Sequence, residues 1–288
     1  MKKTLILCQM LLAYQQLNHD ATALFEPQLL RPIPTSEQLN SVCMAGTEKI
    51  FAAGNSGTIL SVSLNTGGRE LYNSRTPNNL NAIFFADKYR GTAVGDKGTA
   101  IFTTDAGLNW KTSKTSTSKN LHDVCKAGED IVFAVGLAGT VLRSSNSGMV
   151  WNKINSGHSI PLFSAHFANP KFGSIGAFGS ILITKDSGKT WSRTALSMSG
   201  NSQLVSVFTA DSSLICASSN TPHGTFIKST DGGISWTETG LNLPYLFGGS
   251  VDLVEDMVFS DRVTGMVITK YGTILRTTDG GDTWTADT

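Results

Sequence analysis

The chain carries little charge and has no excess of either sign. Its 288 residues include 23 Lys and Arg against 22 Asp and Glu, which gives a net charge of +1 without a long basic run. A protein that binds nucleic acid usually presents clustered positive charge to the phosphate backbone, so we expect no nucleic-acid partner. Proline is also scarce, with 8 residues, and the 29 glycines are spread along the chain. No linker divides it, and we expect one domain after the N-terminal segment.

Long apolar runs are missing as well. The run from Leu5 to Tyr14 is interrupted by Gln9 and is too short for a bilayer, which needs about 20 residues. Two lysines precede it and Ala21-Thr22-Ala23 follows, which is the layout of a secretory signal peptide. We therefore expect residues 1–23 to be a signal peptide and residues 24–288 to be the folded domain of a periplasmic or secreted protein. An amphipathic N-terminal helix is the alternative interpretation.

Sustained helical periodicity is absent after residue 25, and a repeat takes its place. Five stretches share the pattern [ST]-x-[DN]-x-G-x-x-W, of which "RTTDGGDTW" is the last, and their tryptophans are 41, 40, 45 and 48 residues apart. A sixth copy at residues 54–68 has lost its tryptophan. The repeat unit at residues 80–115 reads as four short strands joined by tight turns. Such units predict an all-β fold, a single β-propeller of four-stranded antiparallel blades, with six blades expected and seven as the alternative.

Cysteine is scarce too, and its spacing suits neither zinc nor a disulfide framework. The four cysteines include no CxxC pair. We align Cys43 and Cys125 with one position of the repeat, held elsewhere by Phe84, Phe167, Phe208 and Phe259. Cys216 stands alone. We predict buried thiols that act as small apolar residues, and we expect no metal and no cofactor.

The repeated motif resembles the Asp-box, also called the bacterial neuraminidase repeat. Units such as "NLNAIFFADKYRGTAVGDKGTAIFTTDAGLNW" resemble the photosystem II stability/assembly factor-like family of propellers. That resemblance implies a non-catalytic protein, expected to be a monomer, that binds a protein partner or assists assembly of an envelope or membrane complex. The family is usually seven-bladed, whereas six units are counted here. The segment "LLRPIPTS" at residues 29–36 is expected to close the ring by pairing with the final blade.

The Asp or Asn that recurs in each box is interpreted as structural. Asp or Asn accepts backbone hydrogen bonds that hold a turn, glycine supplies positive φ, and tryptophan buries a large surface between blades. Copies distributed around a ring cannot share one catalytic site. The predicted structural residues are Asp105, Trp110, Asn146, Trp151, Asp186, Trp191, Asp231, Trp236, Asp279 and Trp284.

Candidate binding residues are sought where the repeat is broken. Polar residues on the first strand of each unit should line a central channel, and His122 beside Asp123 suggests a proton-transfer pair or part of a metal site. Neighbouring residues on a strand point to opposite faces, so ordinary polar residues are the alternative. An insertion at residues 242–253 adds an apolar cluster, and two arginines share one position on the third strand. The candidates for the channel or rim are His122, Asp123, Asp256, Tyr245, Phe247, Arg143 and Arg276.

Two enzyme classes remain as alternatives. A sialidase-type glycoside hydrolase needs three arginines around a carboxylate, a tyrosine nucleophile with a glutamate, and an aspartate acid/base. The sequence shows no convergent set of this kind. Hydrolysis of xyloglucan normally uses two facing propellers, and only one fits this length. We therefore predict no catalytic residues.

Overall fold

A computed structural model describes residues 35–196, 202–221, 224–243 and 252–286. The predicted signal peptide, the candidates Tyr245 and Phe247, and residues 29–34 of the segment expected to close the ring lie outside the described residues. Strands account for nearly all regular structure, with single-turn 3-10 segments at Asn55–Gly57, Asp96–Gly98 and Leu137–Gly139. In the part of the chain that is described, no helix is long and apolar enough to cross a membrane.

The strands form six sheets, each made of four consecutive strands in antiparallel order, which we number as blades one to six. Blades one and two contain β1 (Leu39–Ala45), β2 (Lys49–Gly54), β3 (Thr58–Ser63), β4 (Arg69–Asn73), β5 (Leu80–Phe85), β6 (Gly91–Gly95), β7 (Ala100–Thr103) and β8 (Lys111–Thr112). Blades three and four contain β9 (Leu121–Lys126), β10 (Val132–Gly136), β11 (Thr140–Ser144), β12 (Asn152–Ile154), β13 (Leu162–Phe167), β14 (Gly173–Ala177), β15 (Ser180–Thr184) and β16 (Ser192–Ala195). Blades five and six contain β17 (Leu204–Thr209), β18 (Ile215–Ser219), β19 (Thr225–Ser229), β20 (Thr237–Gly240), β21 (Val254–Phe259), β22 (Gly265–Thr269), β23 (Ile274–Thr277) and β24 (Thr285–Ala286).

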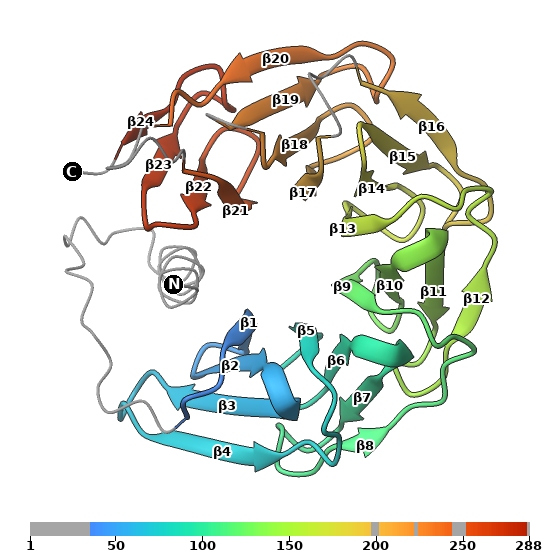
Figure 1. Cartoon of the computed structure of the whole chain (residues 1–288), viewed down its shortest axis with the longest axis vertical. Helices are drawn as coiled ribbons and strands as arrows, with labels where there is room; N and C mark the ends of the chain where they lie inside the picture. The colour runs from blue at the N-terminus through green and yellow to red at the C-terminus, as the bar shows by residue number, and fades with distance from the viewer. Residues whose placement is uncertain (1–34, 197–201, 222–223, 244–251, 287–288) are drawn as a thin grey trace.

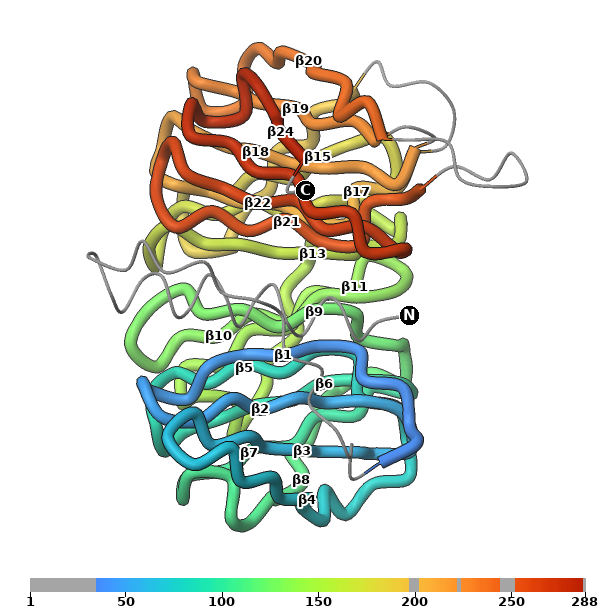
Figure 2. The backbone as a smooth tube through the Cα atoms, turned by 90° about the vertical axis from the view of Figure 1, so that its left-hand side faces the viewer, coloured from blue at the N-terminus to red at the C-terminus, as the bar shows by residue number. Residues whose placement is uncertain are grey.

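The blades stand around a ring with the first strand of each innermost (Figure 1), which confirms a six-bladed β-propeller. Figure 2 shows the ring from the side, with the connections between strands at two opposite faces. Because the strands alternate in direction, the turns from the third to the fourth strand and from the first to the second share one face. We call this the box face, since it carries the Asp-boxes. The inner strands begin at the opposite face, which we call the upper face.

Each inner strand carries a β-bulge directly after its first residue. In blade three Leu121 pairs with Gly136 and Asp123 with Val135, so His122 has no partner across the ladder. The same shift in register occurs in the other five blades. A bulge places two residues against one on the neighbouring strand and re-aims their side chains. Simple alternation of faces therefore does not apply to His122 and Asp123.

The core lies between blades rather than within them. Five buried apolar clusters each combine the facing sides of two successive blades, from blades one and two to blades five and six. Between blades one and two, Phe51 stacks on Phe85 at 4.4 Å between ring centroids, and Trp110 meets Phe85 edge-on at 6.0 Å. Packing of this kind is what holds a propeller together, because each sheet alone has two exposed apolar faces.

The alignment proposed for the cysteines is wrong by one residue in two blades. Cys43 pairs with Phe51 and Cys125 with Phe133, and the residues in that register elsewhere are Phe84, His166, Phe208 and Val258. Phe167 and Phe259 instead match Phe85, the residue after it. In this register Phe85 and Phe259 lie over Gly91 and Gly265, where a Cβ atom would stand 2.6 Å from the ring. The phenylalanine needs a glycine across the ladder, and that pairing is the signal that sets the register.

The described cysteines are buried or half-buried free thiols. Cys125 belongs to the cluster between blades three and four, and Cys43 packs against the one between blades one and two. Cys216 lies between blades five and six, where burial raises its pKa to about 12. A thiol with so high a pKa is protonated and acts as a small apolar side chain.

The ring has one junction unlike the others. Inner strands of successive blades lie side by side at all five junctions from β1 and β5 to β17 and β21. Among the described residues, β21 and β1 lack a contact of this extent, and Figure 1 shows blades six and one standing apart. The described blades are each complete with four strands, so the last blade takes its strands from the C-terminal part of the chain alone.

Candidate functional site

The Asp-box turn is a closed set of short hydrogen bonds. In the last box Asp279 Oδ1 accepts from the Thr277 hydroxyl at 2.7 Å and from the backbone N–H of Thr283 at 3.0 Å, while Oδ2 accepts from the Thr283 hydroxyl at 2.6 Å. The Thr277 hydroxyl oxygen also accepts from the Gly281 N–H at 2.9 Å. The acid therefore reaches four residues ahead, farther than the two residues of a simple Asx-turn. These bonds, with the Thr283 hydroxyl first, hold the pKa of Asp279 well below its usual range.

The box with Asn in place of Asp shows what the acid contributes. Asn146 Oδ1 accepts from the Ser144 hydroxyl and the Val150 N–H, both at 2.9 Å, as the acids do in their own boxes. The residue four positions ahead is Val150, which has no side-chain donor. In the Asp105 box the corresponding Asn109 side chain donates to Oδ2 at 2.8 Å. The second carboxylate oxygen and the second donor are thus lost together, and the turn remains satisfied.

The box also docks each blade on the preceding one. Gly107 has φ of 82°, and a Cβ atom there would lie 2.5 Å from the Phe51 ring of blade one. Gly188 has the same relation to Phe133 of blade three, at 2.8 Å. Trp110 is 1% exposed in the cluster that these contacts complete. Glycine and tryptophan of the box therefore contribute to one packing contact between blades, beside the turn that the acid holds.

Three of the polar residues on the inner strands form an equivalent set of hydrogen bonds between blades. Asn40 donates to the carbonyl of Leu80 and Asn81 to that of Leu121, each at 2.9 Å. His122 Nδ1 lies 2.8 Å from the carbonyl of Leu162. Each side chain occupies the bulge and reaches the first residue of the next inner strand. The imidazole of His122 is thus used in the same way as the two amides, as a donor that fixes adjacent blades.

The next residue along the inner strand has a second bridging role in blades three and four. Asp123 Oδ2 accepts from the backbone N–H of Ala165 in blade four at 2.8 Å, and its Oδ1 accepts from Val124 at 2.8 Å. Burial raises the pKa of this carboxyl although both bonds favour the ionised form. The structure brings His122 and Asp123 to the same neighbouring blade, but to different partners. Ser164 accepts in the same way from the Val207 N–H, at 3.2 Å.

Asp256 lies at the corresponding position of blade six. Its Oδ1 lies 2.8 Å from the hydroxyl of Ser206 in blade five and accepts from the Met257 N–H at 2.8 Å. The inner-strand candidates Asp123 and Asp256 stand in blades three and six, and each is engaged with its own adjacent blade. Among the described residues, no group of three or more His, Cys, Asp or Glu side chains is placed to hold a metal ion.

His166 is a buried histidine whose pKa is strongly lowered. Its Nδ1 accepts from the backbone N–H of Thr209 in blade five at 3.1 Å, and its ring lies 4.9 Å from that of Phe208. Burial lowers its pKa to about 4, so the ring is neutral near pH 7. The sequence offered a weak signal for this residue, because its position elsewhere in the repeat is apolar.

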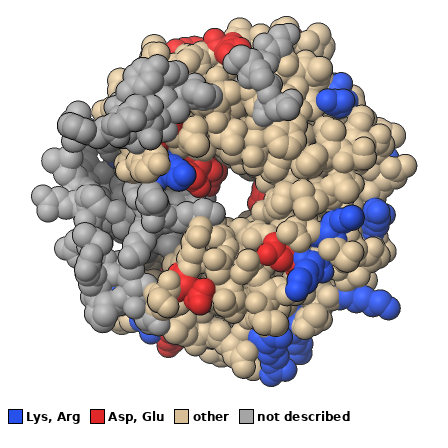
Figure 3. Space-filling model, in the orientation of Figure 1, with Lys and Arg blue, Asp and Glu red and all other residues tan. Residues whose placement is uncertain are grey.

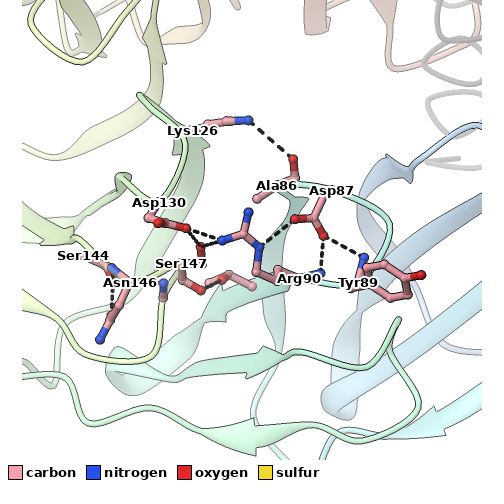
Figure 4. Close-up of polar contacts among 11 residues, drawn as sticks. Ala86, Asp87, Tyr89, Arg90, Lys126, Asp130, Ser144, Asn146 and Ser147 are labelled. Atoms are coloured by element: carbon pink, nitrogen blue, oxygen red, sulfur yellow. Dashed lines mark hydrogen bonds and ion pairs between the residues drawn. The ribbon is translucent and has the colours of Figure 1, made fainter.

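The two candidate arginines do not meet. Arg143 lies on β11 of blade three with its guanidinium 6.0 Å from the Phe133 ring centroid, and Arg276 lies on β23 of blade six. None of the six inner strands contains an arginine. An arginine outside the candidate list joins two blades on the box face (Figure 4): Arg90 Nε donates to Asp87 at 2.6 Å and its Nη1 pairs with Asp130 of blade three. Both carboxylates are partly exposed, so this link is a surface contact of small energy.

The upper face has an aromatic row that the sequence reasoning missed. The rings of His122 and Phe163 stack with centroids 5.5 Å apart and planes 3° from parallel, and Phe178 meets Phe163 edge-on at 4.9 Å. Phe178 is 37% exposed, although its backbone pairs with Gln203 at the start of blade five. Phe163 occupies the bulge position held by Asn40 and Asn81. Its ring has no hydrogen-bond donor, so blade four has an aromatic surface at this position instead of a side-chain hydrogen bond to the next blade.

The surroundings of the central opening are mixed in charge. Figure 3 shows an opening through the ring, acidic side chains among those at its border, and most basic side chains at the outer edge of the visible face. Leu243 and Asp252 belong to the predicted insertion at residues 242–253, of which residues 244–251 lie outside the described residues. Both lie where blade five passes to blade six at the upper face. The aromatic row and this junction are thus on the same face of the ring.

Comparison with known proteins agrees with this geometry. A family model described as "Photosynthesis system II assembly factor YCF48" matches residues 102–242. The solved structure of YCF48 from Cyanidioschyzon merolae has a TM-score of 0.66 at 17% identity, covering 89% of this chain and 86% of that chain. A structure of YCF48 bound to D1 peptide has a TM-score of 0.68 at 15% identity, covering 88% and 82%.

An enzyme propeller is also similar in fold. The GH74 xyloglucanase from Xanthomonas campestris has a TM-score of 0.69 at 12% identity, covering 87% of this chain but 45% of that one. A search of curated proteins finds no match. At these identities the structural likeness shows the fold alone.

Proposed function

We propose that this chain, an Asp-box β-propeller that resembles the YCF48 assembly-factor family, is a non-catalytic, exported protein. It binds a protein partner and assists assembly or stability of an envelope or membrane complex. The resemblance of residues 102–242 to the assembly-factor repeat supports the class of function. YCF48 bound to D1 peptide supports a protein as the partner. The layout of residues 1–23, with two lysines, an apolar run and Ala21-Thr22-Ala23, supports export.

The proposal of a non-catalytic role is carried by how the polar inner residues are used. Asn40, Asn81, His122 and Asp123 each bond to the backbone of the next blade, and Asp256 bonds to Ser206 of the preceding one. A general acid or base must instead be free to reach a substrate. The box carboxylates lie on the opposite face and accept hydrogen bonds within their own turns.

The upper face is the proposed binding surface. It carries the partly exposed Phe178 beside Phe163 and His122. Because these rings already pack on one another, they lose little side-chain entropy when a partner binds. Phe178 lies in the turn between the second and third strands, which has two residues in blade four, where Ala177 pairs with Ser180, and three in blade three, where Gly136 pairs with Thr140. A large, partly exposed ring in this shortened turn supports a role in recognition.

A glycoside hydrolase is the second candidate, because a xyloglucanase propeller shares the fold. That match covers less than half of the enzyme, and a sialidase would need three arginines around one carboxylate. The arginines of β4, β11, β16 and β23 stand in four different blades, namely one, three, four and six. These observations favour the binding protein over either hydrolase.

Affinity purification with a matched pair of variants tests the proposal. Phe178→Ser removes the exposed ring of the upper face, and Leu108→Ser removes an apolar side chain that is 64% exposed at the tip of a box. We expect wild type and Leu108→Ser to retain the same envelope protein, identified by mass spectrometry, and Phe178→Ser to lose it. Retention of the partner by both variants would show that the aromatic row is not the binding surface. Absence of a partner together with hydrolysis of a fluorogenic sialoside would overturn the proposed function.

Export is tested separately. Cell fractionation should recover the protein outside the cytoplasm, and its intact mass should correspond to a chain that begins at Leu24. A cytoplasmic protein that keeps residues 1–23 would contradict the export proposal and leave the binding experiment unaffected.

A further inference from the structure

The upper face changes from polar to apolar between blades two and three. The change affects the turn from the second to the third strand and the two residues before the next inner strand. The turn holds Asn55 and Ser56 in blade one, Asp96 and Lys97 in blade two, and Leu137 and Ala138 in blade three. The residues before the next inner strand are Asn78 and Asn79, Lys119 and Asn120, and then Ile160 and Pro161.

These apolar residues adjoin the aromatic row. Ala138 is exposed, and Leu137, Ile160 and Pro161 are half-buried. Pro161 stands two residues before Phe163, whose ring contacts those of His122 and Phe178. The upper ends of blades three and four therefore form one apolar surface, which blades one and two do not have at the same positions.

One hydrogen bond between blades is lost with this change. In blades one and two the N–H of the second turn residue donates to an asparagine side chain at the start of the next blade. The two bonds are from Ser56 to Asn79 at 3.0 Å and from Lys97 to Asn120 at 2.9 Å. In blade three the donor is Ala138, and Pro161 stands in place of the asparagine. The Ala138 N–H forms no hydrogen bond with a described residue, so an exposed donor lies at the edge of the apolar surface.

Two lysines flank this surface on the side of blade two. Lys97 and Lys119 are exposed, and the bond from Lys97 to Asn120 places both near the inner strand that carries His122. The five ion pairs among the described residues involve other basic side chains. The carboxylate of Asp96 accepts from the side-chain amides of two asparagines. Acidic side chains of a partner would complement the two lysines.

We propose that this surface binds an extended segment of the partner protein that has an apolar centre and acidic flanks. The assignment rests on the proposed function, since it names what the upper face binds. An apolar side chain of the segment packs on Phe163 and Phe178, and a backbone carbonyl accepts from the Ala138 N–H. Acidic side chains beside it face Lys97 and Lys119. An extended segment meets these demands because its carbonyls are unpaired and its side chains alternate between two sides.

Fluorescence anisotropy with a defined peptide tests the assignment on the full chain. The probe is a labelled peptide of ten residues, blocked at both ends, with Phe-Leu at its centre, two glutamates on each side and serine elsewhere. One counterpart has Ser-Ser at the centre, and another has lysine in place of each glutamate. We expect the wild type to bind the probe about tenfold or more tightly than either counterpart. Phe178→Ser should weaken binding about fivefold or more.

Pro161→Asn separates binding from stability, because it supplies the acceptor that blades one and two have. Its side-chain oxygen should accept from the Ala138 N–H, which leaves the melting temperature unchanged or higher. Its affinity for the probe should fall about fivefold or more, since the donor is occupied. Pro161→Ala is the matched control without an acceptor, and its affinity should stay within about twofold of wild type. In NMR spectra of the wild type, the probe should shift the Ala138 amide resonance.

The contrary results each point to a different error. Equal affinity of Pro161→Asn and Pro161→Ala for the probe would overturn the role of the Ala138 N–H. Equal binding of the glutamate and lysine peptides would overturn the acidic flanks. Failure of the wild type to bind the probe would overturn the site, and a wild-type dimer that Phe178→Ser dissociates in analytical ultracentrifugation would assign it to a second copy. None of these measurements uses a captured envelope protein, so the proposed function is decided separately by the affinity purification.

Discussion

His166 should make the stability of the propeller depend on pH in the range where no Asp-box acid titrates. Its pKa is about 4 in the folded protein against an ordinary value of 6.5, because burial disfavours the imidazolium. The unfolded chain therefore binds the proton more readily, and the stability is fully present above pH 6.5. It declines as pH falls toward 4. Linkage gives a loss of about 2 kcal/mol between pH 8 and pH 5 from this group alone.

Phe is the informative replacement, because the repeat itself places Phe84 and Phe208 at this position. His166→Phe keeps an aromatic ring beside Phe208 but removes the acceptor of the Thr209 N–H, which lies 3.1 Å from Nδ1. We expect a cost of about 1–2 kcal/mol at pH 8, where the imidazole is neutral in both the folded and the unfolded protein. The additional loss between pH 8 and pH 5 should disappear.

Urea unfolding at pH 5, 6, 7 and 8, followed by tryptophan fluorescence, measures both effects. The wild-type unfolding free energy should fall toward pH 5, and the unfolding free energy of His166→Phe should not change over the same range. A wild-type profile that is flat between pH 5 and 8 would refute the burial of a neutral imidazole. A variant with the wild-type slope would assign the pH dependence to another group.

Two further substitutions test the packing and hydrogen bonds of the boxes. Trp110→Ala should lower the unfolding free energy by about 3–5 kcal/mol, because the ring is 1% exposed between blades one and two. A decrease of less than about 1 kcal/mol, measured by chemical denaturation, would show that the ring is not packed as described. Asn146→Asp should destabilise the box of blade three, because Val150 has no side-chain donor for the second carboxylate oxygen. Adding Val150→Thr should restore the melting temperature. Equal melting temperatures of the single and double variants would show that the two positions are independent.

The architecture could be predicted because its determinants are local and repeated. The box fixes one turn through hydrogen bonds within seven residues, as from Thr277 to Thr283, and its spacing marks one blade. Turn residues and glycines act through short-range geometry that a sequence displays directly. The same argument assigns the box acid to structure, because Asn146 keeps the acceptor and drops the charge.

The inner strands could not be read in the same way. Alternation of faces separated His122 from Asp123, but the bulge at Leu121–Asp123 sends both side chains to blade four. The bulge leaves no residue signature of its own, since the bulged position holds Asn, His, Phe, Val or Glu in different blades. Its position emerges from the pairing of whole strands. The placement of His166 and the junction of blades six and one likewise depend on contacts between distant segments.

The blade-to-blade hydrogen bonds explain why the departure at Phe163 points to recognition. Asn40, Asn81 and His122 each tie their blade to the next through one side chain. Phe163 cannot, and the junction of blades four and five is held by other contacts, among them Ser164 accepting from Val207, His166 accepting from Thr209, and the backbone pairing of Phe178 with Gln203. A ring in place of a donor removes one hydrogen bond from the junction. The contacts of Phe163 with His122 and Phe178 instead form an aromatic surface that extends across blades three and four, and this supports the upper face as the proposed binding surface.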